Sequence, residues 1–443
     1  MTSDLIFHRD GWPGSLSDDA EARSVTRLRI EVGDATLTRH VSKRGGTDSE
    51  AINTSLLPLG EFLANNWWTL LYEPLRPTVT DAFRVRHRLD SGMRGFAFPS
   101  IAVWSGGART VMTDWASFEN PFSTVSFLTA SPQEPIQLER EATELELMDL
   151  VETIVERVRD ARDGGRDLLE AWDRVSESIS NPGEASYCAA AGRLGIDPYD
   201  PDGIDLTPLK DGIPEQLFDD VSEIVEIDDL VTTAAWIRGA EARLKLFPET
   251  DISYFGVPAE DSLGDKPAVA GHASAELLRG YAGLAKDPRT AVAELLGGAI
   301  GDQGAIASAG PDGINALVQR LDTAARIGAI AKSARQRRFR ACAGLYMAWT
   351  TEPGQARATT QAFTRRQIAS RAFAAELLAP QSYLLEIMPR HGFDDEDIEA
   401  LASEVICPYS TVMWQAYRAG IPLRGIEIPH FDKWPVMTAR ASF

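Results

Sequence analysis

The sequence has few cysteines, no long apolar run and little positive charge. Its three cysteines, Cys188, Cys342 and Cys407, lie far apart, so they provide neither a disulfide framework nor a paired-cysteine metal motif, and they fit a reduced cytosol. No window approaches about 18 uninterrupted apolar residues, so we expect no transmembrane helix. The first residues lack the basic and apolar segments of a signal peptide. We therefore expect a cytoplasmic protein without a membrane partner.

The shortage of positive charge bears on the kind of partner. The chain carries 44 Lys and Arg against 65 Asp and Glu, a formal charge of −21. A protein that binds nucleic acid usually presents a basic face, so the acidic balance argues against a nucleic-acid partner. Residues 84–88 and 335–340 are local basic clusters. We expect their arginines to be solvated or paired with acids, with nucleic-acid binding as the alternative.

Alternating polar and apolar residues predict strands in the first part of the chain. Residues 26–32 alternate strictly, and Gly33-Asp34 then turns the chain back into residues 35–41. A second hairpin is predicted over residues 100–113. With the helix predicted over residues 56–72, these strands indicate a small α+β domain over residues 24–130.

Helical periodicity dominates the rest of the 443 residues. Apolar residues at helical spacing between positions 147 and 158 form one face of an amphipathic helix. Similar patterns predict a helical domain over residues 135–250 and a C-terminal domain over residues 265–425, followed by an irregular tail, residues 426–443. The predicted fold class is α+β, predominantly helical.

Candidate binding residues in the first domain are aromatic or basic. Trp67 and Trp68 point about 100° apart on a helix, so one can enter the core while the other covers a neighbouring element. Arg86 and His87 lie in the cluster of residues 84–88, which we expect to be an exposed strand edge, with an anion site as the alternative. Packing is the main expectation for the tryptophans, and ligand binding is the alternative.

Two stretches of the C-terminal domain carry a family resemblance. Residues 338–347 read Arg-Phe-Arg-Ala-Cys-Ala-Gly-Leu-Tyr-Met, and residues 372–380 read Ala-Phe-Ala-Ala-Glu-Leu-Leu-Ala-Pro. They resemble the two signature helices of the ImmA/IrrE family of bacterial zinc metallopeptidases. The family's first helix usually reads Arg-Phe-x-x-Ala-His-Glu-x-x-His, and its second roughly Glu-x-x-Ala-x-x-Phe-Ala-x-x-Leu-Leu-x-Pro. The resemblance covers about residues 265–425 and implies a zincin-like fold there.

The metal-binding residues of that family are missing from this sequence. Two histidines four residues apart on a helix can hold one zinc ion, and the glutamate beside the first acts as the general base. Alignment on the shared Arg-Phe places Ala343, Gly344 and Met347 at these positions. The third ligand is a glutamate of the second helix, where Gln367 or Ala369 stands instead. The resemblance implies zinc, but its ligands are absent, so we expect no cofactor.

The resemblance implies a function without catalysis. ImmA/IrrE proteins typically act in bacterial stress, mobile-element or phage-related regulation, often by cleaving a repressor. A relative without zinc ligands is expected to be a pseudoenzyme that regulates or scaffolds through a protein partner. The sequence names neither that partner nor the oligomeric state.

The alternative is an active metal-dependent peptidase or hydrolase with a relocated site. His391 stands near Asp394 and Asp395, and such a cluster could bind a divalent ion, although acids at a helix N-terminus are favoured by the helix dipole without any metal. His87, His272 and His430 are further histidines, and His272 alone on an alanine-rich face predicts a packed or solvated side chain. Cys342 could be a nucleophile, but a small buried apolar residue is its expected role.

Overall fold

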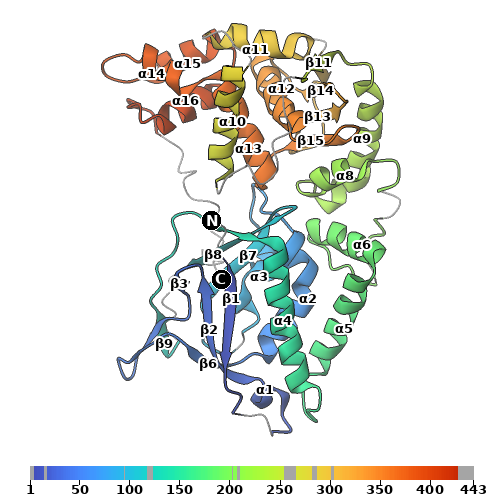
Figure 1. Cartoon of the computed structure of the whole chain (residues 1–443), viewed down its shortest axis with the longest axis vertical. Helices are drawn as coiled ribbons and strands as arrows, with labels where there is room; N and C mark the ends of the chain where they lie inside the picture. The colour runs from blue at the N-terminus through green and yellow to red at the C-terminus, as the bar shows by residue number, and fades with distance from the viewer. Residues whose placement is uncertain are drawn as a thin grey trace. The chain divides into compact units, whose positions relative to one another are not determined.

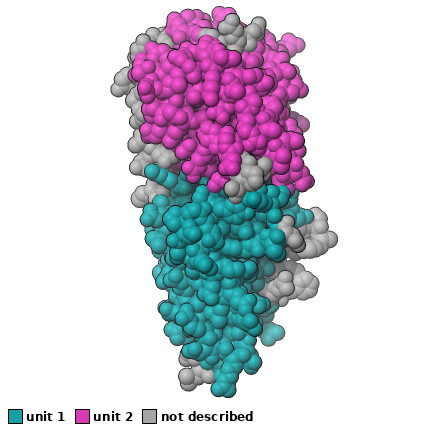
Figure 2. All heavy atoms as spheres, turned by 90° about the vertical axis from the view of Figure 1, so that its right-hand side faces the viewer, with its two compact units in different colours: residues 1–206, 431–443 teal, residues 207–430 magenta. Residues whose placement is uncertain are grey.

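The computed structural model describes residues 4–13, 17–93, 95–116, 123–201, 203–206, 210–253, 266–281, 287–300 and 304–427. The chain divides into two compact units, Met1–Leu206 with Phe431–Phe443, and Thr207–His430 (Figure 2). This division differs from the predicted three domains, because its boundary falls inside the helical domain expected over residues 135–250. The predicted tail lies outside the described residues from position 428 onward.

The described residues of the first unit form three antiparallel sheets (Figure 1). The first sheet contains β1 (Leu5–Asp10), β2 (Val25–Val32), β3 (Ala35–Thr36) and β6 (Ile52–Ser55). The second contains β7 (Ser100–Gly107), β8 (Thr110–Ala116) and β10 (Ile136–Glu139), and the third β4 (His40–Ser42), β5 (Asp48–Ser49) and β9 (Val125–Phe127). The predicted strand at residues 26–32 and the predicted hairpin at residues 100–113 are confirmed as β2 and as β7 with β8. Strand β1 lies before the predicted start of this domain, and it is held by pairing with β2.

One helix forms the centre of the first unit. Helix α2 (Leu57–Tyr72) contacts α4 (Arg140–Val158), α5 (Arg166–Ser180) and α6 (Pro182–Arg193). Its buried leucines and tryptophans join one core with the apolar face of α4, as the helical periodicity predicted. The shorter helices of this unit are α1 (Ala20–Arg23), α3 (Asp81–His87) and the 3₁₀ turn η1 (Leu89–Ser91). The expectation of a strand edge at residues 84–88 is wrong, because Thr80 caps a helix there by accepting a hydrogen bond from the Phe83 amide.

A single sheet supports the second unit within the described residues. Its order is β11 (Glu249–Asp251), β14 (Ala324–Ile330), β13 (Ile314–Arg320) and β15 (Ala356–Thr360), and β12 (Ala305–Ala307) pairs in parallel with β14. Strands β13 and β14 pair in antiparallel fashion at the centre of this sheet. Helix α12 (Ala334–Trp349) follows β14 and packs on the sheet. Helix α13 (Arg365–Leu378) packs on α12 and on α10 (Pro267–Tyr281).

Two helices of the second unit begin at clear side-chain caps. Asp287 accepts hydrogen bonds from the amides of Arg289 and Thr290 at the start of α11 (Pro288–Leu296), and the Ser333 hydroxyl accepts one from the Gln336 amide at the start of α12. The others are α8 (Glu215–Ser222), η2 (Ile227–Asp229), α9 (Leu230–Leu244), η4 (Gly297–Ile300), α14 (Gln381–Ile387), α15 (Asp395–Glu404) and α16 (Tyr409–Arg418).

The predicted mixed α+β class is confirmed. Helices and several small sheets share the described residues, and each unit has its own cluster of buried apolar side chains. Across the part of the chain that the structure describes, none of the helices has the length and apolar character needed to cross a membrane.

Candidate functional site

The positions aligned with the zinc ligands and the general base lie in the core of the second unit. Ala343 and Met347 on α12 are 3% and 0% exposed. Their neighbours Leu345, Tyr346 and Ala348 are buried as well. This half of the helix packs as core, and the face aligned with the zinc-binding face of the resembled family is filled with apolar side chains.

Gly344 shows how tightly this helix lies on the sheet. A Cβ atom added at this position would lie 2.6 Å from Ile327 Cγ2 on β14 and 3.4 Å from Val318 Cγ2 on β13. Because real Cβ contacts are not shorter than about 3 Å, no side chain fits without movement of Ile327. A glutamate general base has no room at this position.

Gln367, at one of the two positions considered for the third zinc ligand, has a structural role. It is buried, its Oε1 accepts a hydrogen bond from the Thr360 amide at 2.8 Å, and its Nε2 donates to the Ala358 carbonyl at 2.9 Å. These bonds attach α13 to β15. The four expected positions therefore do not fit a zinc ion: an alanine methyl, a glycine, a buried thioether and a fully engaged amide are no zinc ligand set.

Cys342 is a buried thiol. Burial raises its pKa to about 12, although the neighbouring Arg338 and Arg279 oppose the rise. The thiolate is the nucleophilic form of cysteine, so this group is inert at neutral pH. The expectation of a small buried residue is confirmed.

The alternative site near His391 does not come together as a metal site among the described residues. His391 is exposed. Asp394 caps α15 in a capping box, because its Oδ1 accepts a hydrogen bond from the Asp397 amide while Asp397 Oδ2 accepts one from the Asp394 amide. Asp395 accepts a hydrogen bond from the Tyr409 hydroxyl at 2.5 Å. The acids start a helix, as the helix-dipole interpretation predicts; His430 lies outside the described residues.

The paired tryptophans are packing residues of the first unit. Trp67 is 2% exposed and meets Trp172 edge to face, with ring centroids 5.2 Å apart. Trp68 is also buried, and its indole Nε1 donates to the Tyr199 hydroxyl at 2.8 Å. Both side chains are therefore engaged inside this unit, which fits the main expectation.

Arg86 and His87 belong to a buried charge cluster with Glu73. Arg86 donates to both oxygens of Glu73, at 3.0 and 2.7 Å. His87 is fully buried, with Nε2 3.1 Å from Glu73 Oε2 and Nδ1 2.6 Å from the Val103 carbonyl. Burial acts to raise the pKa of Glu73, but the hydrogen bonds and charges of His87 and Arg86 outweigh it and lower that pKa. This cluster joins α3 to β7, and its groups are satisfied by one another.

The basic stretch of residues 335–340 is also engaged within the protein. Arg335 Nη2 lies 2.8 Å from Glu399 Oε1, and Arg340 donates to the Ile330 carbonyl. Arg338 is 7% exposed. The ion pair of Arg335 agrees with the expectation of solvated or acid-paired arginines, whereas the burial of Arg338 and the carbonyl bond of Arg340 differ from it.

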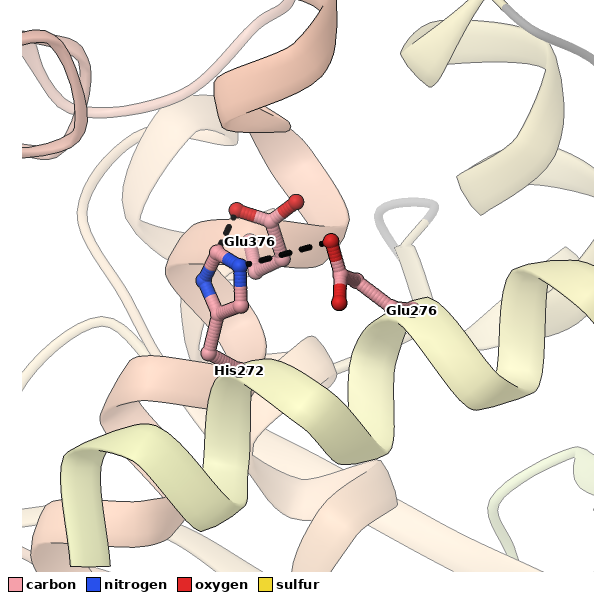
Figure 3. A group of neighbouring side chains, drawn as sticks. All are labelled: His272, Glu276 and Glu376. Carbon is pink, nitrogen blue, oxygen red and sulfur yellow. Dashed lines mark ion pairs between the residues drawn. The ribbon is translucent and has the colours of Figure 1, made fainter. Parts of the chain in front are cut away.

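Three residues that the sequence analysis did not bring together meet between α10 and α13. His272 and Glu276 stand four positions apart on α10 and project toward Glu376 on α13 (Figure 3). One ligand atom from each lies within 4.8 Å of the others. His272 Nδ1 is 3.1 Å from Glu376 Oε2, and His272 Nε2 is 3.5 Å from Glu276 Oε1. Imidazole and carboxylate groups so placed can exchange a proton or hold a metal ion.

The close approach of the two helices creates this cluster. A Cβ atom at Gly271 would lie 2.1 Å from the Ala369 carbonyl oxygen and 3.0 Å from Ala372 Cβ, so only glycine allows α10 this near to α13. The detectable sequence signal was the spacing His-x-x-x-Glu on one helix face together with an acid inside the apolar run of residues 372–380. The alanine-rich surroundings of His272 and the apolar neighbours of Glu376 hide this signal in the sequence.

Glu376 is a buried carboxyl group, with a side chain 1% exposed. Burial raises its pKa to about 7, with Glu276 adding to the rise, whereas hydrogen bonds from the Gln381 amide and Gln415 Nε2 and the charge of Arg279 oppose it. Gln415 Nε2 lies 2.6 Å and the Gln381 amide 3.2 Å from Glu376 Oε2. The carboxyl group is thus fixed in orientation and divided between its two protonation states at neutral pH.

Comparison of the chain with protein-family models, with curated proteins and with solved structures gave no match.

Proposed function

We propose that the second unit is a metallopeptidase-like module without peptidase chemistry, which acts by binding a protein partner. The observation that carries this proposal is the packing of Gly344 against Ile327, because it leaves no room for a general base where the resembled family has one. Ala343 and Met347, at the two histidine positions, are buried beside it. Loss of the base and both histidines together removes the hydrolytic step and leaves a folded scaffold.

The order of elements supports the same proposal. Two antiparallel strands, β13 and β14, directly precede α12, and strands of this kind stand just before the zinc helix in the ImmA/IrrE family. Helix α13 then packs against α12. Its buried Phe373, Leu377 and Leu378 stand at the apolar positions of the family's second signature helix. By resemblance, the partner is a repressor or another regulator of a bacterial stress, mobile-element or phage-defence system.

The test asks whether a partner is bound intact or cut. Proteins cross-linked to the chain in its host would be identified, and the best candidate would be purified and mixed with the chain in the presence of Zn²⁺. We expect a complex of defined stoichiometry in which the intact mass of the partner does not change. Chelator-sensitive cleavage of the partner would overturn the proposal.

A matched variant identifies the source of any cleavage. His272→Gln removes the imidazole between α10 and α13 and leaves α12 untouched. Cleavage by the wild type that this variant lacks would establish the alternative, a hydrolase with a relocated site. Absence of cleavage in both proteins, with the complex retained, supports the binding function.

A further inference from the structure

We propose that His272, Glu276 and Glu376 bind one divalent first-row metal ion, with Zn²⁺ and Mn²⁺ as the best candidates. This site lies between α10 and α13 and uses none of the α12 positions of the resembled family. The inference is independent of the proposed binding function, since a metal here requires no reaction at α12.

The cluster places three donors within 4.8 Å of one another, with Glu376 facing Nδ1 and Glu276 facing Nε2 of His272. Residues four apart on a helix share a face, so the α10 pair presents an imidazole and a carboxylate side by side. Glu376 faces them from α13, with its Oε2 3.1 Å from His272 Nδ1 (Figure 3). Ligand atoms around a tetrahedral ion with bonds of about 2 Å stand roughly 3.3 Å apart, against 4.8 Å or less here. Because an imidazole binds an ion through one nitrogen, the exposed Glu276 has to rotate from Nε2 toward the nitrogen that Glu376 faces.

The types of donor select the class of ion. One nitrogen and carboxylate oxygens without a thiolate suit borderline and hard dications, whereas soft ions such as Cu⁺ prefer sulfur. Calcium prefers six to eight oxygen ligands, and magnesium keeps most of its water, so neither gains much from a single imidazole. Zn²⁺ and Mn²⁺ accept both donor types.

Electrostatics favour a cation between these side chains. Two carboxyl groups converge there, and one of them is buried. Arg279 is the neighbouring cation on α10; its Nη2 donates to the Leu377 carbonyl at 2.6 Å, and its single charge opposes only part of the effect of burial on Glu376. A bound dication would compensate the buried charge of Glu376 at close range, where the low dielectric makes such compensation strong.

The surroundings prepare one ligand and leave the others accessible. Gln415 and the Gln381 amide donate to Oε2 of Glu376, the oxygen that faces His272, and hold the carboxyl group in place, as hydrogen-bond donors to a metal ligand do. His272 and Glu276 are 26% and 60% exposed, so an ion reaches the cluster from solvent. Three protein ligands leave a coordination position for water or for a group of a partner.

The test is calorimetric titration of Zn²⁺ and of Mn²⁺ into the full, untagged chain after removal of metals with a chelator. We expect one saturable site per chain for at least one of the two ions. His272→Gln and Glu276→Gln should each weaken it by about 10-fold or more, since even loss of a group behind a ligand costs that much. Both changes are at partly or largely exposed side chains, so they test the site without a substitution at the buried Glu376 that could impair folding.

The matched controls are His391→Gln and Glu396→Gln, which change an exposed histidine and an exposed acid away from the cluster. Binding should stay within about two-fold of the wild type in both, well under the 10-fold loss expected of a ligand variant. No saturable binding at millimolar metal would overturn the proposal. Equal weak binding by the wild type and all four variants would mean an adventitious ion only and would also overturn the proposal. Loss of the site in His391→Gln would overturn it as well.

Discussion

Gly344 occupies the position of the general base in the resembled family, and its lack of a side chain is what lets α12 lie against β14. The added Cβ atom would contact Ile327 Cγ2 at 2.6 Å, and a β-branched side chain in a sheet has little freedom to yield. Gly344 is thus a packing residue. Placing histidines and a glutamate at positions 343, 344 and 347, as the resembled family has them, would therefore disturb the core.

We predict that Gly344→Ala destabilises the second unit. Overpacking costs about 1–3 kcal/mol, which exceeds the gain of about 1 kcal/mol that alanine brings to a helix interior. Urea unfolding should therefore show a net loss of up to about 2 kcal/mol. Adding Ile327→Ala should cost less in Gly344→Ala than in the wild type, because the two residues compete for the same space.

Gly239 provides the matched control for this prediction. It lies in α9, and a Cβ atom added there would meet nothing within 4 Å. Gly239→Ala should raise the free energy of unfolding by up to about 1 kcal/mol through helix propensity alone. Equal stabilisation by both substitutions would show that Gly344 is not closely packed.

At the scale of elements, α8 covers the edge of the sheet. Strand β15 is an edge strand, and unpaired edges invite association with other strands. Asp220 of α8 accepts hydrogen bonds from Arg357 at 2.7 and 2.6 Å and from the Ala358 amide at 2.8 Å. Asp220 is 2% exposed, so one carboxylate attaches the helix to the strand in a nearly dry environment.

We predict that Asp220→Asn loosens α8 from β15. Removing one partner of a buried ion pair costs about 3–5 kcal/mol, since the remaining charge stays buried without compensation. The loss should appear in urea unfolding and as faster amide hydrogen exchange in β15. Glu215→Gln changes an exposed acid on the same helix and should alter stability by less than about 0.5 kcal/mol; comparable losses in the two variants would contradict this role of Asp220.

Local elements could be predicted from the sequence, whereas the contacts between them could not. Strand β2 and the apolar face of α4 follow from periodicity, because their signal lies within a few residues. Asp220 and Arg357 are 137 residues apart, and no pattern in either segment predicts contact with the other. The same holds for His272 and Glu376, which meet only because α10 packs on α13. Strand β1 was not predicted for the same reason, because it forms by pairing with β2, which is a contact between separate segments.

At the scale of the whole molecule, two separate cores divide the chain. The buried apolar cluster of the first unit runs from Leu5 to Ala189, and that of the second from Ile252 to Ile421. Each unit is large enough to bury a core of its own, since domains typically contain about 100–200 residues. Each unit should therefore unfold at its own midpoint temperature.

We predict two transitions in differential scanning calorimetry, each sensitive to one core. Leu59→Ala in the first unit and Leu377→Ala in the second both truncate fully buried leucines, at a cost of about 2–5 kcal/mol. Each should lower one midpoint by roughly 5–15 °C and leave the other in place. One transition that both substitutions shift would show instead that the units unfold together.

The same experiment locates the proposed metal site. An ion that binds the folded state raises the midpoint of the unit that holds it, by an amount that grows with its concentration. Because His272, Glu276 and Glu376 all belong to the second unit, Zn²⁺ or Mn²⁺ should raise only the transition that Leu377→Ala lowers. His272→Gln should abolish that rise and leave the metal-free midpoint nearly unchanged, since this side chain is partly exposed. A metal-induced rise in the transition that Leu59→Ala lowers would assign the ion to other residues.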